Sequence, residues 1–418
     1  MKILHTSDWH LGQKLIEKDR AEEHKLFLDW LLEVLEEKQI NILVIAGDIF
    51  DTHNPPKEAE NYYADFLARA SKITEHIVII AGNHDSTATL EAYKAVLKAL
   101  DIHVVGSFNE DPAQEILPLR NRKSKQIETV VAAVPFLRDN LLIRSIPRED
   151  IQDRKERMVQ AMYDHYQRIA EATSAYEKEK IPLIATGHLF VAGAKDSESE
   201  RQIHVGTLDC MKADIFAPIF SYVALGHLHR PQQVAQKEFI RYSGSPIPLS
   251  FGEVEDKKST KEVVLLEYNG SQLQKISPIS VPTARSLKRF KGTFEEVMDA
   301  MEKYNFENIE GKLEPWFDAV ITANTLSRVQ YEKVQEVARQ KKIELLSIKL
   351  ESRNKDHSNN SQIEDYGSLD WERIKLDPIE LFKKKYQADN GKEPSKELMD
   401  AFYELFSIVQ NNESTSLF

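Results

Sequence analysis

Five short polar motifs in the first 230 residues carry side chains suited to binding divalent metal ions. They are Asp8-Trp9-His10, Gly47-Asp48, Gly82-Asn83-His84-Asp85, Gly187-His188 and Gly226-His227-Leu228-His229. Each follows a strand-like run, and the carboxyl ends of strands in an α/β sheet form the edge where ligands bind. Asp, Asn and His donors suit borderline ions such as Mn, Fe, Zn or Co. Together the motifs predict a metal site.

The spacing of these donors indicates more than one ion. Asp8 and His10 should face the same side, because alternate residues of an extended segment share a face, and so should His227 and His229. A carboxylate can bridge two ions about 3.5 to 4 Å apart, as in two-metal phosphatases and nucleases, and Asp48 is the candidate for that role. A lone histidine would more simply be structural. Seven donors at strand ends would be an unexplained burial of polar groups.

The elements that position these motifs are strands and helices in alternation. We expect strands at residues 3–5, 42–46, 77–81, 130–134, 183–186 and 222–225, with helices between them. The clearest helix runs from residue 154 to about 180, where Met158, Met162 and Ile169 fall near one face. This order predicts a layered α/β domain over residues 1–260.

The remaining residues predict further units, as expected for a chain of 418 residues. A strand is expected at 263–268. Strands at 317–322 and 345–350 and helices at 294–304 and 328–340 predict a small α+β domain across 275–350. Residues 351–370 are polar and predict a linker. Two helices are expected within 371–418, around 378–387 and 395–409.

Composition excludes some classes of protein. No apolar run approaches the roughly 18 residues that a membrane span needs, and the start enters a strand pattern with no signal peptide, so a cytoplasmic protein is expected. The single cysteine, Cys210, excludes an internal disulfide; we interpret it as a small buried hydrophobe and not a reactive thiol. A net charge of -12 argues against DNA binding by bulk electrostatics. DNA binding must therefore be local, helped by bound metal ions, or shared with a partner.

The motifs resemble those of a known family. The stretches that carry the resemblance are residues 6–12 (Thr-Ser-Asp-Trp-His-Leu-Gly), 47–52 (Gly-Asp-Ile-Phe-Asp-Thr), 224–230 and 243–251. They resemble the calcineurin-like metallophosphoesterases and, among these, the SbcD family of double-strand-break repair nucleases. The resemblance covers nearly the whole chain and is strongest over the first 255 residues. It implies a four-layer α/β sandwich with a small α+β capping domain and a C-terminal helical hairpin.

The resemblance also implies roles for individual residues. One ion would be held by Asp8, His10, Asp48 and His229, and the other by Asp48, Asn83, His188 and His227. His84 would be the catalytic acid and Asp85 would support it. The cofactor would be two divalent ions, manganese first and magnesium as the alternative. Archaeal relatives carry a histidine where this chain has Asp51, and we give the later His53 no catalytic role.

The implied activity is DNA cleavage. It comprises 3′ to 5′ exonuclease action on duplex DNA, endonuclease action on single strands and hairpin cleavage, by a water that the two metals activate. The implied partners are DNA, a second copy of the chain and an SbcC-type ATPase, whose coiled coil would dock on the helices of 371–418 in a heterotetramer. Those helices could instead pack on their own domain. A protein phosphatase or cyclic-nucleotide phosphodiesterase would use the same metal cage, and a non-catalytic scaffold is a third alternative.

Several aromatic and histidine residues stay open to two interpretations. Trp9 should pack in the core more readily than stack on a base. A helix carries an apolar face of Tyr62, Tyr63, Phe66 and Leu67, which is either ordinary core or a homodimer contact. We expect three further histidines to be structural or to support the ligands: His5, His24 and His204.

Overall fold

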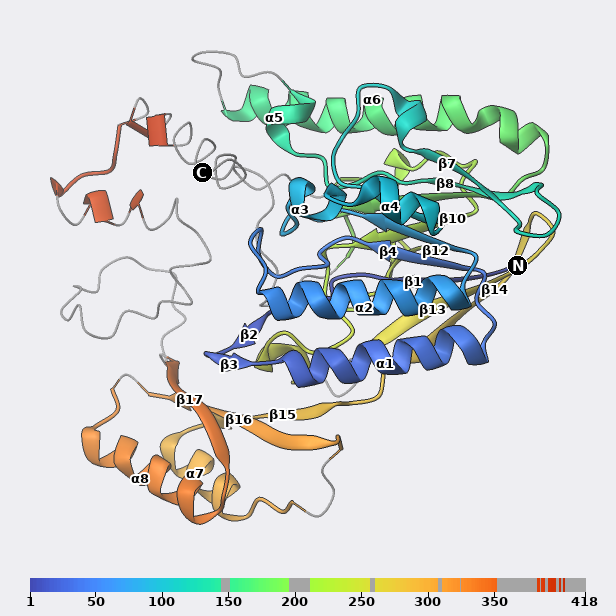
Figure 1. The fold of residues 1–418 in the computed structure, drawn as a ribbon. Helices are drawn as coiled ribbons and strands as arrows, with labels where there is room; N and C mark the ends of the chain where they lie inside the picture. Colours follow the sequence, from blue (N-terminus) through green and yellow to red (C-terminus); the bar gives the residue numbers. More distant parts are fainter. Residues whose placement is uncertain are drawn as a thin grey trace.

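The computed structural model describes residues 1–143, 151–194, 211–255, 260–306, 310–323 and 325–351, and short pieces between 382 and 402. The predicted linker, Cys210, His204 and most of the predicted C-terminal helices lie outside the described residues. Within the described part, Figure 1 shows a larger body of two sheets with helices on both outer faces and a smaller unit beside it.

The first sheet is a six-stranded sheet built mostly of parallel strands. Its order is β14 (Gln272–Ser280), β13 (Glu262–Asn269), β1 (Lys2–Thr6), β4 (Ile42–Ala46), β5 (His76–Ile80) and β6 (Ile102–Val105). The last four run parallel, and β13 and β14 are antiparallel additions at one edge. Four of these strands confirm predicted ones. Strand β14 pairs here although its residues fall partly within the range expected for the second domain.

The second sheet has a similar design. Its order is β11 (Gln232–Val234), β12 (Lys237–Tyr242), β10 (Tyr222–Gly226), β9 (Leu183–His188), β8 (Ile127–Ala132) and β7 (Ile116–Arg120). The four central strands are parallel, and the strand at each edge is antiparallel. Each of the two sheets therefore contains a group of four parallel strands, and the larger body holds the carboxyl ends of both groups.

The central strands, such as β4 and β5, read as continuous apolar runs because both of their faces are buried. In β4, Leu43 and Ile45 join the core under the outer helices, whereas Ile42, Val44 and Ala46 point to the core between the two sheets. This alternation follows from the two-residue period of a strand. The sheets thus share one apolar layer and each has a helical layer outside, which gives the four layers expected from the sequence.

The helices cover the outer faces. The first sheet is covered by α1 (Ala21–Glu37) and α2 (Lys57–Ile73), and α3 (Thr87–Glu91) and α4 (Lys94–Ala99) contact its edge strand β6. The second sheet is covered by α5 (Asp139–Leu142) and α6 (Ile151–Lys178). Short 3-10 helices occur at η1 (Pro112–Gln114), η2 (Ala213–Ile215) and η3 (Phe251–Val254). Strands β2 (Lys14–Leu15) and β3 (Lys18–Asp19) pair in an antiparallel two-stranded ribbon. Helix α6 confirms the clearest helix prediction, with Met158, Met162 and Ile169 buried.

The smaller unit is a three-stranded parallel sheet with helices in between. It runs β15 (Arg285–Gly292), α7 (Phe294–Glu302), β16 (Leu313–Thr322), α8 (Arg328–Gln340) and β17 (Glu344–Glu351). Each helix starts at a capping box, Thr293 with Glu296 and Ser327 with Gln330, which satisfies free backbone N–H groups. The predicted strands and helices are confirmed, but β15 was missed because most of its residues are Arg, Lys, Ser or Gly.

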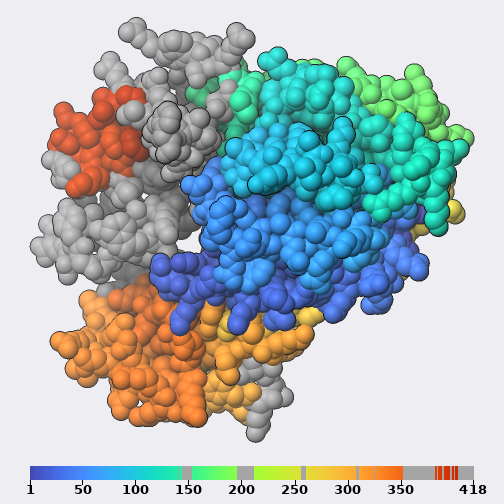
Figure 2. Space-filling view, in the orientation of Figure 1, coloured from blue at the N-terminus to red at the C-terminus, as the bar shows by residue number. Residues whose placement is uncertain are grey.

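The smaller unit is attached to the larger body by apolar and ionic contacts. Leu287 and Trp316 pack with Leu15 and Phe251. Figure 2 shows the orange surface of this unit against the dark blue surface of the chain's first residues. Beneath this contact Glu23 lies buried between two arginines, within 3.1 Å of Arg20 Nε and of Arg285 Nε. The attachment therefore includes a buried charge network.

Two pieces of the C-terminal region are described and contact each other. The rings of Phe382 and Phe402 stack with centroids 4.1 Å apart and planes 10° apart, and Phe382 also approaches Tyr386. These residues belong to the two helices predicted within 371–418. Among the described helices, none is both long and apolar enough to cross a membrane.

Candidate metal centre

The loops that follow β1 and β4 run side by side and bring two ligand candidates together. Backbone bonds link Asp8 N to Gly47 O at 2.9 Å and His10 N to Asp48 O at 3.0 Å. Asp8, His10 and Asp48 have positive φ angles of 54°, 48° and 50°. Such angles are rare outside glycine and cluster at functional sites. The local backbone is therefore bent to aim these side chains at one point.

Two glycines keep the surrounding backbone close. A Cβ on Gly226 would lie 1.9 Å from the carbonyl oxygen of Ala46, and one on Gly47 would lie 2.4 Å from Nδ1 of His188. Only glycine fits where main chain and ligand side chain approach so closely. The glycines of the sequence motifs thus allow the two sheets to meet at their carboxyl ends.

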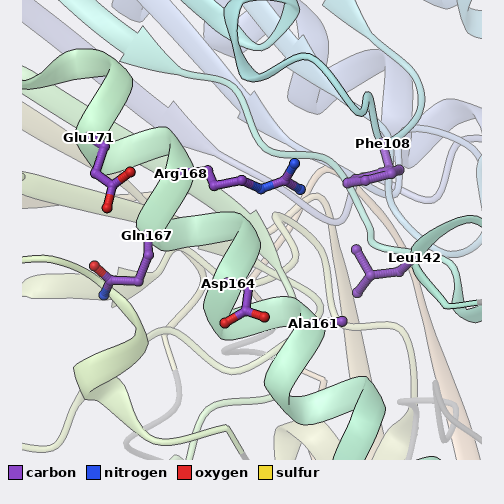
Figure 3. Close-up of a pocket in the computed structure, with 7 residues that line it drawn as sticks. All are labelled: Phe108, Leu142, Ala161, Asp164, Gln167, Arg168 and Glu171. Atoms are coloured by element: carbon purple, nitrogen blue, oxygen red, sulfur yellow. The ribbon is translucent and has the colours of Figure 1, made fainter.

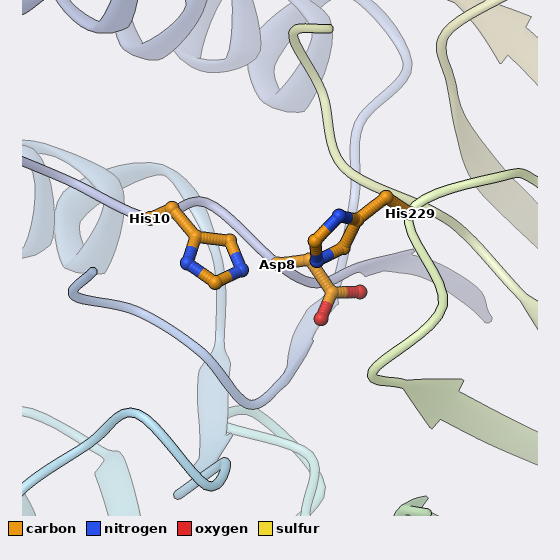
Figure 4. A group of neighbouring side chains, drawn as sticks. All are labelled: Asp8, His10 and His229. Carbon is orange, nitrogen blue, oxygen red and sulfur yellow. The ribbon is translucent and has the colours of Figure 1, made fainter. Parts of the chain in front are cut away.

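The structure brings three groups of possible ligand atoms together. They are Asp8 with His10 and His229, His10 with Asp48 and His84, and Asp8 with Asp48 and His188, and all of these residues are buried. Figure 4 shows the first group, in which His229 comes from a different part of the chain than Asp8 and His10. The shared members join the groups into one cluster.

Asp48 occupies the middle of the cluster. Its Oδ2 atom lies 3.5 Å from His10 Nε2 and 3.3 Å from His188 Nε2, and its Oδ1 accepts a bond from the His84 backbone N–H at 2.9 Å. It therefore faces ligands from both predicted ion sites, as a bridging carboxylate would.

Asn83 and His227 complete the second predicted site. Asn83 Oδ1 lies 3.0 Å from His188 Nε2, and the His227 ring centroid lies 5.5 Å from that of His188. The backbone N–H of His227 donates to Asp8 Oδ1 at 2.8 Å. All seven predicted ligands thus gather in one place.

The hydrogen-bond partners of the histidine ring nitrogens are those expected at a metal centre. His188 Nδ1 donates to the carbonyl oxygen of Ala46 at 3.0 Å, which leaves the Nε2 lone pair for the cluster. Nε2 of His10 is buried without a hydrogen-bond partner, an arrangement that is costly unless something binds there. Backbone or carboxylate partners on the far nitrogen are usual for metal-binding histidines.

The electrostatics of the cluster point the same way. Burial lowers the pKa of His188, but Asp48 and Asp8 outweigh it and raise that pKa to about 9. Burial likewise lowers the pKa of His10, and Asp51 and Asp48 raise it to about 9. Burial raises the pKa of the Asp8 carboxyl. The carboxylates therefore draw positive charge to the centre, either protons or metal cations, which compete for the same atoms.

His84 belongs to the cluster through its closeness to His10 and Asp48, and its ring is held through the outer nitrogen. Its ring centroid is 4.8 Å from that of His10, and its Nδ1 donates to the main-chain oxygen of Asp51 at 2.6 Å. Asp85 accepts bonds from the backbone N–H groups of Gly82, Ile49 and Phe50 at 2.8, 3.2 and 3.0 Å. Asp85 thereby joins the loop that carries His84 to the loop after β4.

Several supporting residues were not predicted. Glu253 Oε1 lies 3.7 Å from His229 Nδ1, and Lys261 Nζ donates to Glu253 at 2.5 Å and to the His229 carbonyl at 2.9 Å. Ser7 lies between Asp8 and Ser243. Ser7 and Ser243 occur in the quoted motifs, but the sequence gives no signal for Glu253, which is distant from His229 along the chain.

The structure also shows where the aromatic and histidine residues lie for which the sequence allowed two interpretations. Trp9 is buried against Phe27 and Phe66, and its Nε1 donates to Thr6, so packing is confirmed over base stacking. Tyr63, Phe66 and Leu67 belong to the core, and Tyr62 is partly buried against it. His5 and His24 are buried, and His5 Nδ1 lies 3.0 Å from the Tyr222 hydroxyl. His53 is half-buried and lies 3.5 Å from an Arg138 nitrogen.

A separate surface hollow lies along α6, with a volume of about 520 Å³ (Figure 3). It shares no residue with the cluster above. Its lining is Phe108, Leu142, Ala161, Asp164, Gln167, Arg168 and Glu171.

Residues 1–231 match the family described as calcineurin-like phosphoesterase, and residues 283–390 match one described as type 5 capsule protein repressor C-terminal domain. The chain therefore belongs to the calcineurin-like phosphoesterases, and within them to the SbcD family. It is 36% identical over 350 residues to the SbcD subunit of the SbcCD nuclease of Escherichia coli K12, covering 84% of this chain and 85% of that protein. It is 30% identical to the Bacillus subtilis protein of the same name, over 99% of this chain and 100% of that one.

A third relative of that name, from Rhodobacter capsulatus, is 36% identical over 72% of this chain and 76% of its own. A solved structure, that of TT1561 from Thermus thermophilus, aligns with 12% identity and a TM-score of 0.32, covering 67% of this chain and 98% of that chain.

Proposed function

We propose that this chain is a metal-dependent DNA nuclease that hydrolyses phosphodiester bonds as the SbcD-type component of an SbcCD complex. The observation that carries the proposal is the buried cluster around Asp48, in which Nε2 of His10 has no hydrogen-bond partner. The curated relatives, which match over most of both chains, are named as nucleases, which supports a nucleic acid as the substrate. The family resemblance of the sequence motifs implies that this nucleic acid is DNA.

The proposed ligand sets are the predicted ones. Asp8, His10, Asp48 and His229 would hold one divalent ion, and Asp48, Asn83, His188 and His227 the other. Four imidazoles among seven ligands suit manganese better than magnesium, which prefers oxygen donors and retains its waters. When bound, such a pair lowers the pKa of water to near neutrality and offsets charge on the phosphoryl oxygens.

The protein's own groups would do the rest of the chemistry. His84 would give a proton to the departing 3′ oxygen, a contribution on the order of 10² to 10⁴ in rate. Asp51 holds the His84 ring through its main-chain oxygen, and Asp85 fixes the loop. The burial of the candidate ligands would keep them oriented.

The activities proposed are 3′ to 5′ exonuclease action on duplex DNA, endonuclease action on single strands and hairpin cleavage. The domain plan proposed is a nuclease domain in 1–260, a capping domain in 275–350, a linker in 351–370 and helices in 371–418 that dock an SbcC-type coiled coil. The stacked pair of Phe382 and Phe402 supports a helical hairpin in that last region.

A homodimer is part of the proposal, and its contact surface needs revision. The apolar face expected on α2 is mostly core, whereas Tyr93, Val96 and Leu100, in and around α4, are 72%, 63% and 46% exposed. An exposed apolar patch of this kind suits a second copy of the chain. Sedimentation over a range of concentrations tests it.

The competing function is a phosphomonoesterase or a cyclic-nucleotide phosphodiesterase, because the metal cage is common to all of them. Cleavage of labelled duplex and hairpin DNA, set against hydrolysis of p-nitrophenyl phosphate, distinguishes these functions. Activity on DNA that requires manganese supports the nuclease, and turnover of the monoester alone contradicts it.

A further inference from the structure

Arg138 stands next to the proposed catalytic acid, in a segment that the fold ties to the metal centre. It follows β8, whose carboxyl end lies beside that of β9. The backbone N–H of Phe136 donates to the Ala81 carbonyl at 2.9 Å, just before the loop that carries His84. Arg138 Nη2 donates to the main-chain oxygen of Asp85 at 2.8 Å. The guanidinium is therefore fixed at the side of the site where His84 lies.

The contacts of the partly buried Arg138 differ from those of the other buried or partly buried arginines compared with it. Arg20 and Arg285 share the buried carboxylate of Glu23, and Arg289 pairs with Asp318. Arg138 makes no ion pair with a carboxylate of the described residues. Its contacts are one carbonyl oxygen, the nitrogen of His53 and the face of the Phe136 ring, 5.7 Å from its centroid. Burial lowers the pKa of Arg138, and the nearby carboxylates of Asp85 and Asp48 oppose that effect without forming a direct ion pair with it.

A guanidinium that makes no direct ion pair with a described carboxylate suits a phosphate at this place. The chain carries a net charge of -12, and the carboxylates of the centre repel a polyanion wherever metal ions do not offset them. A guanidinium has five N–H donors in a rigid fork that matches phosphate oxygens. With one nitrogen held by the Asp85 carbonyl, the others remain to donate.

We propose that Arg138 binds a phosphate of the DNA strand beside His84. The proposal rests on the nuclease function proposed above. A structural role for Arg138 is the alternative, since its bond to Asp85 also holds the loop that carries His84.

The test compares Arg138→Gln, Arg138→Lys and wild type in manganese-dependent cleavage of a labelled duplex by the full chain, with and without its ATPase partner. Glutamine keeps one N–H donor for the Asp85 carbonyl but loses the charge. Arg168→Gln is the matched control, because it removes the same charge from the exposed surface of α6. Bound manganese and the melting temperature are measured for every variant.

Loss of a charge-assisted contact predicts a KM for DNA about 10- to 100-fold higher in Arg138→Gln. The amount of bound manganese should be the same in Arg138→Gln as in wild type. The salt dependence of its DNA binding should be weaker by about one phosphate contact. Arg138→Lys should recover part of the loss in DNA affinity. An unchanged KM, or a loss confined to kcat or to bound manganese, would overturn the proposal in favour of the structural role.

Failure of the nuclease function gives a different result. Wild type would then cleave no DNA. The role of Arg138 is in that case tested by measuring how strongly inorganic phosphate inhibits the hydrolysis of p-nitrophenyl phosphate by the two glutamine variants. Weaker inhibition in Arg138→Gln than in Arg168→Gln supports a phosphate-binding Arg138, and equal inhibition overturns it.

Discussion

Nδ1 of His84 donates a 2.6 Å hydrogen bond to the main-chain oxygen of Asp51, whose side chain accepts from Nδ1 of His10 at 3.2 Å. One residue thus orients both a proposed ligand and the proposed acid, through different atoms. A substitution at position 51 changes only the second of these contacts, so the two roles can be separated.

Asp51→Ala should weaken manganese binding and leave the His84 orientation intact. The variant removes the acceptor that holds the His10 ring, and loss of such a partner typically costs about 10-fold in metal affinity. Asp51→Asn keeps an oxygen acceptor and should bind manganese more tightly than Asp51→Ala does. Titration calorimetry with Mn²⁺ measures this, and an alanine variant that binds as tightly as wild type would refute the role.

Glu253 should support the centre in a similar way. Burial raises the pKa of Glu253, but Lys261 and His229 outweigh it and hold that pKa well below its usual range, so the group is ionised. Glu253→Gln removes the charge that faces His229 and Lys261, and manganese affinity should fall about 10- to 100-fold. The exposed Glu238→Gln is the control. Equal affinity in both variants would mean that Glu253 only stabilises the fold.

The attachment of the smaller unit should depend on Glu23 and not on its neighbour. Glu23→Ala leaves Arg20 and Arg285 buried without their carboxylate, and breaking such a network costs about 3 to 5 kcal/mol. Glu22 is 78% exposed at its side chain and lies 3.9 Å from Arg285, so Glu22→Ala should cost less than about 1 kcal/mol. Urea unfolding monitored by Trp fluorescence compares the two. Similar losses would contradict the assigned network.

Stability should fall in mild acid because of His5. Burial lowers the pKa of His5 to about 3, so the folded protein keeps it neutral while the unfolded chain takes up a proton below about pH 6.5. The stabilisation is complete above about pH 6.5 and is lost as pH falls toward about 3. By about pH 5 the loss is about 2 kcal/mol.

His5→Gln should therefore reduce the change in unfolding free energy between about pH 7 and about pH 5 by that amount. Tyr222→Phe removes the hydrogen-bond partner but leaves His5 buried, so its pH dependence should resemble that of wild type. The same pH dependence in His5→Gln would show that another group is responsible.

The sequence predicted those parts of the molecule that depend on local pattern. Strand β4 is apolar at every position, and helix α8 runs over the predicted residues 328–340. Strand β15 was not predicted because its charged residues, among them Arg285 and Arg289, bind carboxylates distant in sequence. The candidate ligands could be predicted because each closely follows a strand or ends one.

The supporting residues could not be found in that way. Asp51 contacts His10 across 41 residues of chain, and Arg138 reaches Asp85 across 53. Glu253 likewise approaches His229 from a later loop. Their roles arise from where the loops meet in the fold. A single sequence carries no local signal for such contacts.

The central claim is tested most directly by manganese-dependent cleavage of end-labelled duplex and hairpin DNA by wild type and His84→Ala, with and without the ATPase partner, and with bound manganese measured in both. Cleavage by wild type and a loss of at least about 10²-fold in His84→Ala at equal manganese content is predicted. No DNA cleavage by wild type in any condition, with p-nitrophenyl phosphate still hydrolysed, would contradict the nuclease function.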